Sequence, residues 1–149
     1  MAVRAERHVS CISHGMSCSD EKDRLNVLSN RVIGAALRVH VELGPGMLES
    51  AYEACLSYEL LDQGLSVERQ KPIPVVYRGR RLDCGYRIDL LVEDVLIVEV
   101  KAIERLEKVH SAQLRSHLRF SERKLGLLIN FNVKSLRDGL KRIVNGFPE

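Results

Sequence analysis

Three residues in the middle of the chain, Asp89, Glu99 and Lys101, are of the types that hold a divalent cation and assist phosphodiester hydrolysis. Asp89 lies in the segment 86–92 and the other two lie in 95–101, and both segments are otherwise largely apolar. A carboxylate buried in such surroundings without a partner costs several kcal/mol, so it must be paired or bind a cation. Carboxylate oxygens suit Mg²⁺ or Mn²⁺, and such a metal can activate a water and stabilise charge on a phosphodiester. A lysine beside the metal can orient that water or neutralise the developing charge.

The loop between these two segments decides whether the three side chains meet. Glu99 and Lys101 are two residues apart, so on a strand they point to the same face, where they could also form a structural salt bridge. A three-residue loop over 93–95 sets Asp89 opposite Glu99. A two-residue turn instead sets Asp89 opposite Val98 and turns Glu99 to the other face. The predicted site therefore requires the longer loop or a bulge.

Hydrophobic spacing predicts the elements that carry these residues. Apolar residues recur at three and four over 25–43 and 48–60, which predicts two helices. Strands are predicted over 75–77, 82–92, 95–102 and 125–131, and further helices over 108–120 and 135–145. The order α-α-β-β-β-α-β-α predicts an antiparallel meander, then a crossover helix that leads to a parallel fourth strand. The strand over 95–102 is apolar on both faces and should be central, so we expect an α/β protein with a four-stranded mixed (α+β) sheet flanked by helices.

The composition is that of one globular domain. The chain has 149 residues, of which 45% are hydrophobic and 29% are charged. Residues 1–20 show little periodicity and predict a flexible N-terminal extension before a domain over 21–149. No apolar run approaches the roughly 20 residues of a spanning helix, and the N-terminus lacks the apolar core of a signal peptide. We therefore expect a cytoplasmic protein without a membrane partner.

The charges are unevenly distributed along the chain. Residues 1–100 hold 12 Lys and Arg against 15 Asp and Glu, whereas residues 101–149 hold 11 against 5. A basic second half can attract a polyanion such as nucleic acid. The alternative is that these basic residues only solvate ordinary helices, and charge by itself does not separate the two interpretations.

Five motifs follow one another along the chain: Gly46-Met47-Leu48-Glu49-Ser50-Ala51-Tyr52, Leu82-Asp83-Cys84-Gly85-Tyr86-Arg87-Ile88-Asp89, Ile97-Val98-Glu99-Val100-Lys101, Ala112-Gln113-Leu114 and Gly126-Leu127-Leu128-Ile129-Asn130-Phe131. In these motifs and in their order the chain resembles the GxxExxY proteins, a branch of the PD-(D/E)xK nuclease superfamily. The resemblance covers roughly residues 25–146. It implies a restriction-endonuclease-like core for the predicted sheet and helices.

The resemblance also implies roles for individual residues. It implies two metal ligands and a catalytic lysine, at Asp89, Glu99 and Lys101. Glu49 matches the first-helix acid that often completes the metal site, although an acid there could simply complement the helix dipole. Gln113 matches the glutamine of a RecB-like Q-x-x-x-Y motif, although it could be an exposed amide. The tyrosine of that motif is replaced by His117, for which we expect a surface position rather than a phosphate contact.

We therefore expect a nuclease that depends on Mg²⁺ (or Mn²⁺) and hydrolyses phosphodiester bonds in nucleic acid, with DNA preferred over RNA. The alternative is a non-catalytic module that binds nucleic acid or a protein partner, in which the carboxylates form a structural network. The sequence has no phosphate-binding glycine loop, Ser-His-Asp set or HExxH motif that would indicate other chemistry. A nuclease this small should need a second copy of itself or a protein partner to select its substrate.

Overall fold

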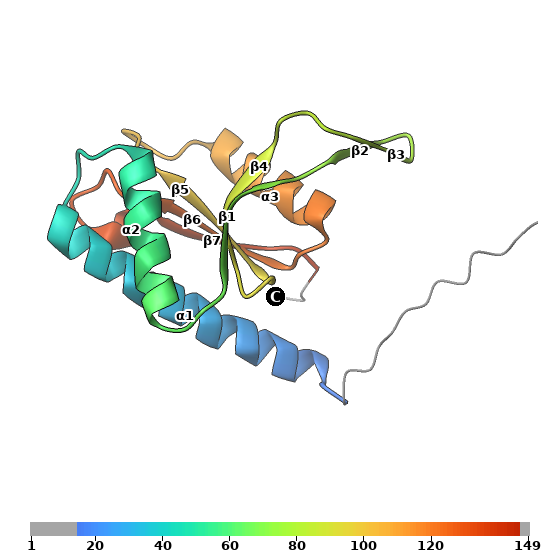
Figure 1. Ribbon diagram of the computed structural model, residues 1–149, viewed down its shortest axis with the longest axis horizontal. Helices are drawn as coiled ribbons and strands as arrows, with labels where there is room; N and C mark the ends of the chain where they lie inside the picture. The colour runs from blue at the N-terminus through green and yellow to red at the C-terminus, as the bar shows by residue number, and fades with distance from the viewer. Residues whose placement is uncertain (1–14, 147–149) are drawn as a thin grey trace, which may run out of the picture.

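The fold is a five-stranded mixed sheet between helices (Figure 1). In the computed structural model, which describes residues 15–146, the strand order is β1-β4-β5-β6-β7, and β2 and β3 form a separate two-stranded sheet. The elements are α1 (Cys18–Leu43), α2 (Glu49–Asp62), β1 (Val67–Pro72), β2 (Val75–Tyr77), β3 (Arg80–Leu82), β4 (Arg87–Val92), β5 (Leu96–Lys101), α3 (Lys108–Ser121), β6 (Leu125–Asn130), the 3-10 helix η1 (Leu136–Gly139) and β7 (Leu140–Val144). The predicted fold class is confirmed, with five strands in the main sheet rather than four.

The sheet separates two hydrophobic layers. α1 and α2 cover one face, and α3 covers the other (Figure 1). On β5, Val98 and Val100 pack toward α1 and α2, whereas Ile97 packs toward α3. Since β5 is buried on both faces, it lies at the centre of the sheet, as the sequence predicts.

The crossover from β5 to β6 is also as predicted. α3 connects two strands that run parallel, in a register that sets Glu99 beside Leu128. The helix buries Leu114 and Leu118 against the sheet and leaves most of its other residues in contact with solvent. This arrangement covers the Glu99 face of β5 with one helix only. Between residues 15 and 146 the structure has no helix with both the length and the apolar character needed to cross a membrane.

The start of α1 falls inside the segment predicted as an extension. The Ser17 hydroxyl accepts a hydrogen bond from the Asp20 N–H, and the Asp20 carboxylate accepts one from the Ser17 N–H. This capping box fixes the first helical residue at Cys18. Residues 18–20 of the predicted flexible extension are therefore helical, and the part of that prediction over residues 1–14 lies outside the described residues.

The strand predicted over 75–77 is confirmed as β2, but its predicted place as the first strand of the meander is wrong. β1, which the sequence does not predict, is the antiparallel neighbour of β4, and residues 75–77 pair with β3 instead. The predicted strand over 82–92 is likewise two strands, separated by a loop in which Gly85 has a φ of 76°. β1 is an edge strand with mostly exposed residues, so main-chain pairing holds it without an alternating apolar pattern.

The helix predicted over 135–145 is also wrong. The segment forms the short η1 helix and then β7, which pairs antiparallel with β6. Leu136, Leu140 and Ile143 are spaced by four and three, as on a helix, but so short a run does not separate helix from strand. At Gly139 a Cβ would collide with the Asn130 carbonyl oxygen, so the chain crosses β6 closely there before it pairs.

Candidate active site

The β4–β5 hairpin has the longer loop that the predicted site requires. Val92 pairs with Leu96, which leaves three residues between the strands. Two of these have φ angles of 53° and 58°, as in a type I′ turn, and the third, Val95, is an extra residue. The pairing continues from the turn as far as Leu90 opposite Val98. One residue further along, the same register sets Asp89 opposite Glu99, on the same face of the sheet.

A pocket of about 200 Å³ on the α3 face of the sheet gathers four of the predicted site residues. Asp89, Glu99, Lys101 and Gln113 all line it. The other lining residues come from the start of β4, from α3 and from β6: Tyr86, Arg87, His110, Leu114, His117 and Leu128. Two carboxylates, a lysine and an amide from three different elements therefore meet in one pocket.

Asp89 is held by two hydrogen bonds and lies next to a second negative charge. Its carboxylate oxygens accept from the Val100 N–H (N···Oδ2 2.8 Å) and from the Gln70 amide (Nε2···Oδ1 3.3 Å). Burial, and then the neighbouring charge of Glu99, raise the pKa of Asp89 to about 6, although both hydrogen bonds act in the opposite direction. The two carboxylates thus carry more negative charge than their surroundings compensate.

Glu99 is buried and bonded to a histidine that the sequence assigns to the surface. His117 Nδ1 lies 2.8 Å from Glu99 Oε1, and the two side chains are only 12% and 8% exposed. An ionised carboxylate only accepts hydrogen bonds, so the imidazole is the donor to it. The predicted surface position of His117 is wrong, because α3 packs directly over β5 and β6 and turns this residue toward the sheet.

The pocket-facing side of α3 carries three polar residues. His110, Gln113 and His117 are spaced by three and four, which sets them along one face of the helix. His110 Nδ1 also accepts from the Glu107 N–H (2.8 Å) and so caps the helix. The sequence reasoning missed His110, although its spacing from Gln113 and His117 was a usable signal.

Lys101 does not form the structural salt bridge that the sequence left open. The hydrogen-bond partner of Glu99 is His117. Over residues 15–146, Lys101 takes part in no ion pair, and its side chain is partly buried at the end of β5. Its ammonium group is therefore available to a ligand of the pocket.

Glu49 lies outside this pocket. It is the first residue of α2, on the other side of the sheet, and its Oε1 accepts from the Ala102 N–H (3.2 Å) just beyond β5. In the described part of the chain, no three His, Cys, Asp or Glu side chains are close enough together to hold a metal ion. Glu49 thus lies near the end of β5, the strand that carries Glu99 and Lys101, but its side chain does not line the pocket that theirs line.

The tyrosine of the same motif has a structural role. Tyr52 is fully buried and stacks on Phe131, with ring centroids 4.6 Å apart. Its hydroxyl donates to the Gly44 carbonyl and accepts from the Met47 N–H. These bonds fix the loop before α2, and with it the position of Glu49 at the start of the helix.

A supporting network behind Asp89 was not foreseen. Gln70 has a φ of 52° within β1, and its amide donates both to Glu53 Oε2 (3.0 Å) and to Asp89 Oδ1 (3.3 Å). Glu53 is itself buried on α2 and pairs with Arg69 (3.3 Å). No sequence pattern indicates this contact, since it depends on β1 lying beside β4.

The residues present fit a divalent cation. Asp89 and Glu99 supply hard oxygen donors in one pocket, and burial, followed by the charge of Glu99, raises the pKa of Asp89. Mg²⁺ in proteins is commonly held by only one or two carboxylates, with waters and substrate phosphates completing its octahedron. A pair of carboxylates at this position is therefore a sufficient protein contribution.

Comparison with known proteins gives one family. No curated protein and no solved structure matches the chain significantly. A family model described as the PD-(D/E)XK nuclease superfamily matches residues 26–143. This range contains the whole pocket and every strand of both sheets except the last residue of β7. With this match over most of its length, the chain belongs to the PD-(D/E)XK nuclease superfamily.

Proposed function

We propose that this protein is a metal-dependent nuclease that hydrolyses phosphodiester bonds, with DNA preferred over RNA. The observation that carries the proposal is the pocket in which Asp89, Glu99 and Lys101 converge. Superfamily membership supports nuclease chemistry in general. The motif from Gly46 to Tyr52 supports, more specifically, the GxxExxY branch of that superfamily.

Asp89 and Glu99 are the proposed ligands of Mg²⁺ or Mn²⁺. When bound, the cation would lower the pKa of a water and offset negative charge on the phosphodiester. Glu49, the third predicted ligand, lies across the sheet from this pocket, where its carboxylate accepts from the Ala102 N–H, so the proposed ligand set does not include it. Both proposed ligands are already held by hydrogen bonds from neighbouring residues, Asp89 by Val100 and Glu99 by His117.

The remaining residues orient the reacting groups. The Lys101 ammonium is proposed to position the attacking water and to stabilise the charge that develops on the phosphate. His117 holds the Glu99 carboxylate in one orientation and limits its rotation. Gln113, whose exposed amide lines the same pocket, is proposed to donate to a phosphate oxygen and so to align the substrate.

The test is a cleavage panel with single- and double-stranded DNA and RNA, each in Mg²⁺, Mn²⁺ or EDTA. Cleavage is expected with a divalent cation and not in EDTA. Lys101→Ala should lower the rate at least about 100-fold, since removal of one preorganised charge-stabilising group costs that much in other hydrolases. Lys141→Ala, at an exposed lysine on β7, is the matched control and should leave the rate unchanged.

Two results would reject the proposal. Cleavage that persists in Lys101→Ala would indicate a contaminating nuclease. Binding of nucleic acid in EDTA without cleavage in any metal would support the alternative, a binding module on a nuclease-like fold. Light scattering of the purified protein tests the related prediction that it acts as a homodimer or with a partner.

A further inference from the structure

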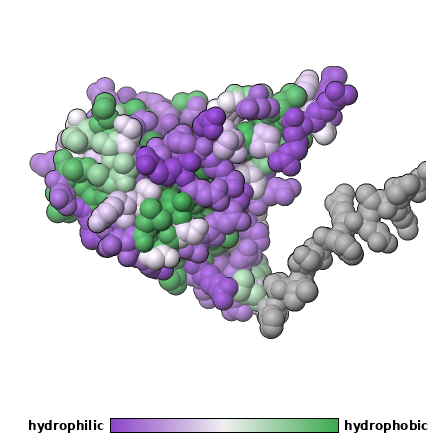
Figure 2. Space-filling model, viewed as in Figure 1, coloured by the Kyte–Doolittle hydropathy of each residue, from purple (hydrophilic) through white to green (hydrophobic). Residues whose placement is uncertain are grey.

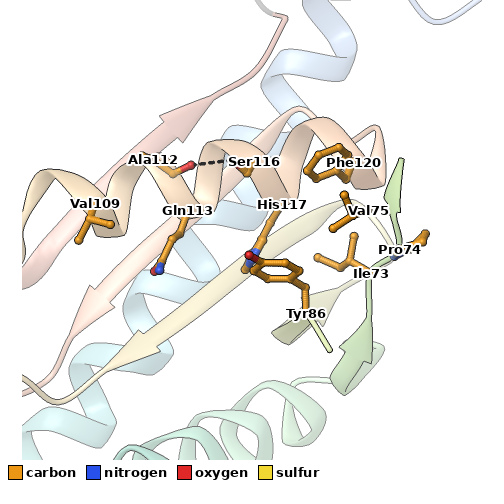
Figure 3. Close-up of a pocket in the computed structure, with 10 residues that line it drawn as sticks. All are labelled: Ile73, Pro74, Val75, Tyr86, Val109, Ala112, Gln113, Ser116, His117 and Phe120. Carbon is orange, nitrogen blue, oxygen red and sulfur yellow. Dashed lines mark hydrogen bonds between the residues drawn. The ribbon is translucent and has the colours of Figure 1, made fainter. Parts of the chain in front are cut away.

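A second, apolar pocket adjoins the carboxylate pocket. It has a volume of about 280 Å³ and lies between α3 and the segment that connects β1 to β2 (Figure 3). Its walls are mainly hydrophobic and aromatic: Ile73, Pro74, Val75, Tyr86, Val109 and Phe120. The pocket contains no residue of the proposed metal set, so the chemistry of the carboxylates does not account for it.

The two pockets share one wall. Tyr86, Gln113 and His117 line both of them. The Tyr86 ring packs edge-on against His117, with centroids 5.9 Å apart, and His117 in turn bonds to Glu99. A group that enters the apolar pocket would therefore be separated from the carboxylates only by these side chains, which is close enough for adjoining parts of one ligand.

The shared wall combines an aromatic surface with free polar groups. Tyr86 is 50% exposed, although it is large and aromatic. Over residues 15–146, neither the Tyr86 hydroxyl nor the Gln113 amide makes a hydrogen bond. Figure 3 shows both side chains next to His117 on the same side of α3. Apolar walls with a few unsatisfied donors and acceptors suit a flat ring that has polar edges.

The charge around the pocket favours a ligand that carries phosphates. Val75 opens the β2–β3 hairpin, which projects from the body of the protein (Figure 1) and bears three exposed arginines at 78, 80 and 81. In the described part of the chain these arginines form no ion pair, and Arg87 extends the basic surface to the rim of the carboxylate pocket. An apolar small molecule or peptide would make no use of these charges, whereas a nucleotide chain would.

We propose that the apolar pocket binds one unstacked nucleobase, adjacent to the phosphate that lies at Asp89 and Glu99. The inference rests on the proposed nuclease function and adds a substrate class to it: nucleic acid that is unpaired at the cleavage position. A single strand offers an unstacked base readily, whereas a duplex must first lose pairing and stacking there. Tyr86 stacks on the base, and Gln113, which lines both pockets, donates to the adjacent phosphate.

The absence of tryptophan from the sequence allows a direct test. Tyr86→Trp introduces a single fluorophore into the pocket wall, and Tyr58→Trp, at a 69% exposed position on α2, is the matched control. Each variant is titrated in EDTA with a labelled thymidine 12-mer and with a 12-base-pair duplex, while anisotropy of the label reports binding. The single strand should quench the indole of Tyr86→Trp at least twofold, and should leave that of Tyr58→Trp unchanged.

A second variant fills the pocket. Ala112 is an exposed residue of α3 that lines the pocket, so Ala112→Phe should occupy it without reaching the carboxylates. A base stacked on an aromatic side chain adds to the affinity for a single strand, so this variant should bind the 12-mer about tenfold more weakly. Affinity for the same oligomer without bases, which retains its phosphates, should not change.

The outcomes separate this inference from the nuclease proposal. Binding of the single strand without quenching in Tyr86→Trp, or with full affinity in Ala112→Phe, would overturn the nucleobase pocket and leave the nuclease proposal standing. Equal quenching by the duplex would overturn the preference for unpaired substrates. No binding of either nucleic acid would overturn the nucleobase pocket, and the cleavage panel with divalent cations would then decide the nuclease proposal by itself.

Discussion

The β2–β3 and β4–β5 hairpins are neighbours in sequence and have the same simple topology, yet they occupy opposite environments. Residues 96–100 of β5 are all buried, whereas every residue of β3 is exposed. Both turns include a non-glycine residue with positive φ, at Arg78 in one and at Glu93 and Asp94 in the other. Turn geometry therefore does not explain the difference between the two hairpins.

The difference lies in what each hairpin packs against. β4–β5 has apolar residues on both faces and is enclosed by α1, α2 and α3, so its few polar side chains have defined positions. β2–β3 contacts little besides itself, and its tip is hydrophilic (Figure 2). A packed hairpin can fix carboxylates within a pocket, whereas an exposed, arginine-bearing hairpin can extend along a ligand.

The largest difference between the two hairpins is expected when one residue is deleted from each turn. Without Val95 the β4–β5 loop no longer supports the present register, and a slip by one residue would turn Glu99 toward α1 and α2, into an apolar layer. We expect a loss of more than about 4 kcal/mol and no cooperative thermal transition by circular dichroism. Deletion of Gly79 from the β2–β3 turn should leave the transition almost unchanged, and similar losses in both deletions would contradict the contrast.

Truncation of one strand residue in each hairpin should give unequal losses of stability. Ile97 is fully buried and Leu82 is 43% exposed. Ile97→Ala leaves a cavity and should lower the free energy of unfolding by about 2–5 kcal/mol. Leu82→Ala should change it by less than about 0.5 kcal/mol. Urea denaturation measures both, and a large loss in Leu82→Ala would mean that the β2–β3 hairpin supports the fold.

Removal of charge from the projecting hairpin should affect binding and not folding. With Arg78, Arg80 and Arg81 all changed to Gln, the slope of log affinity against log salt for single-stranded DNA should fall by about 2, since each phosphate contact contributes about 0.7. Affinity near 0.1 M salt should fall at least about tenfold. Anisotropy titrations in EDTA measure both quantities.

The control for that experiment is a set of arginines on the opposite face of the sheet. Arg24, Arg31 and Arg38 are exposed on α1, far along the chain from the hairpin. Their change to Gln removes the same charge and should leave the salt slope nearly unaltered. An equal decrease in slope would indicate diffuse attraction by net charge and not a contact with the hairpin.

The smallest expected effect is on the pH dependence of stability, and it comes from the Asp89 carboxylate of the β4–β5 hairpin. The pKa of Asp89 is raised to about 6 from 3.8, so this group stabilises the folded state fully below pH 4 and progressively less as the pH rises through 6. In EDTA, Asp89→Asn should therefore be more stable than the wild type at pH 8, by about 1–2 kcal/mol after allowance for partial exposure.

The same variant separates charge from packing. The stability difference between Asp89→Asn and the wild type should become small about one pH unit below 3.8, where the wild-type carboxyl is largely protonated in both states. Addition of 10 mM Mg²⁺ at pH 8 should raise the melting temperature of the wild type and not that of the variant. A difference that is independent of pH would show that the substitution acts through packing alone.

Where local pattern carried the information, the sequence was sufficient. Apolar residues on both faces of 95–101 identify the central strand, and the isolated carboxylates within it identify the candidate site, because burial of an unpaired charge is costly in any fold. The crossover helix follows from its own spacing and from the handedness of such connections. The sequence predicts that Asp89 lies opposite Glu99 only if the β4–β5 loop has three residues. The structure has that loop.

Tertiary structure decided the features that rest on contacts between distant segments. β1 and β7 are edge strands held by main-chain pairing, which leaves no alternating pattern in their side chains. The bond from His117 to Glu99 exists because α3 lies over β5, and Glu49 stays outside the pocket because α2 covers the other face of the sheet. The sequence by itself thus determined the central strands and the chemical types of the site residues. Only the packing of helices on the two faces decided which of those residues share a pocket, because that depends on long-range contacts that no local spacing encodes.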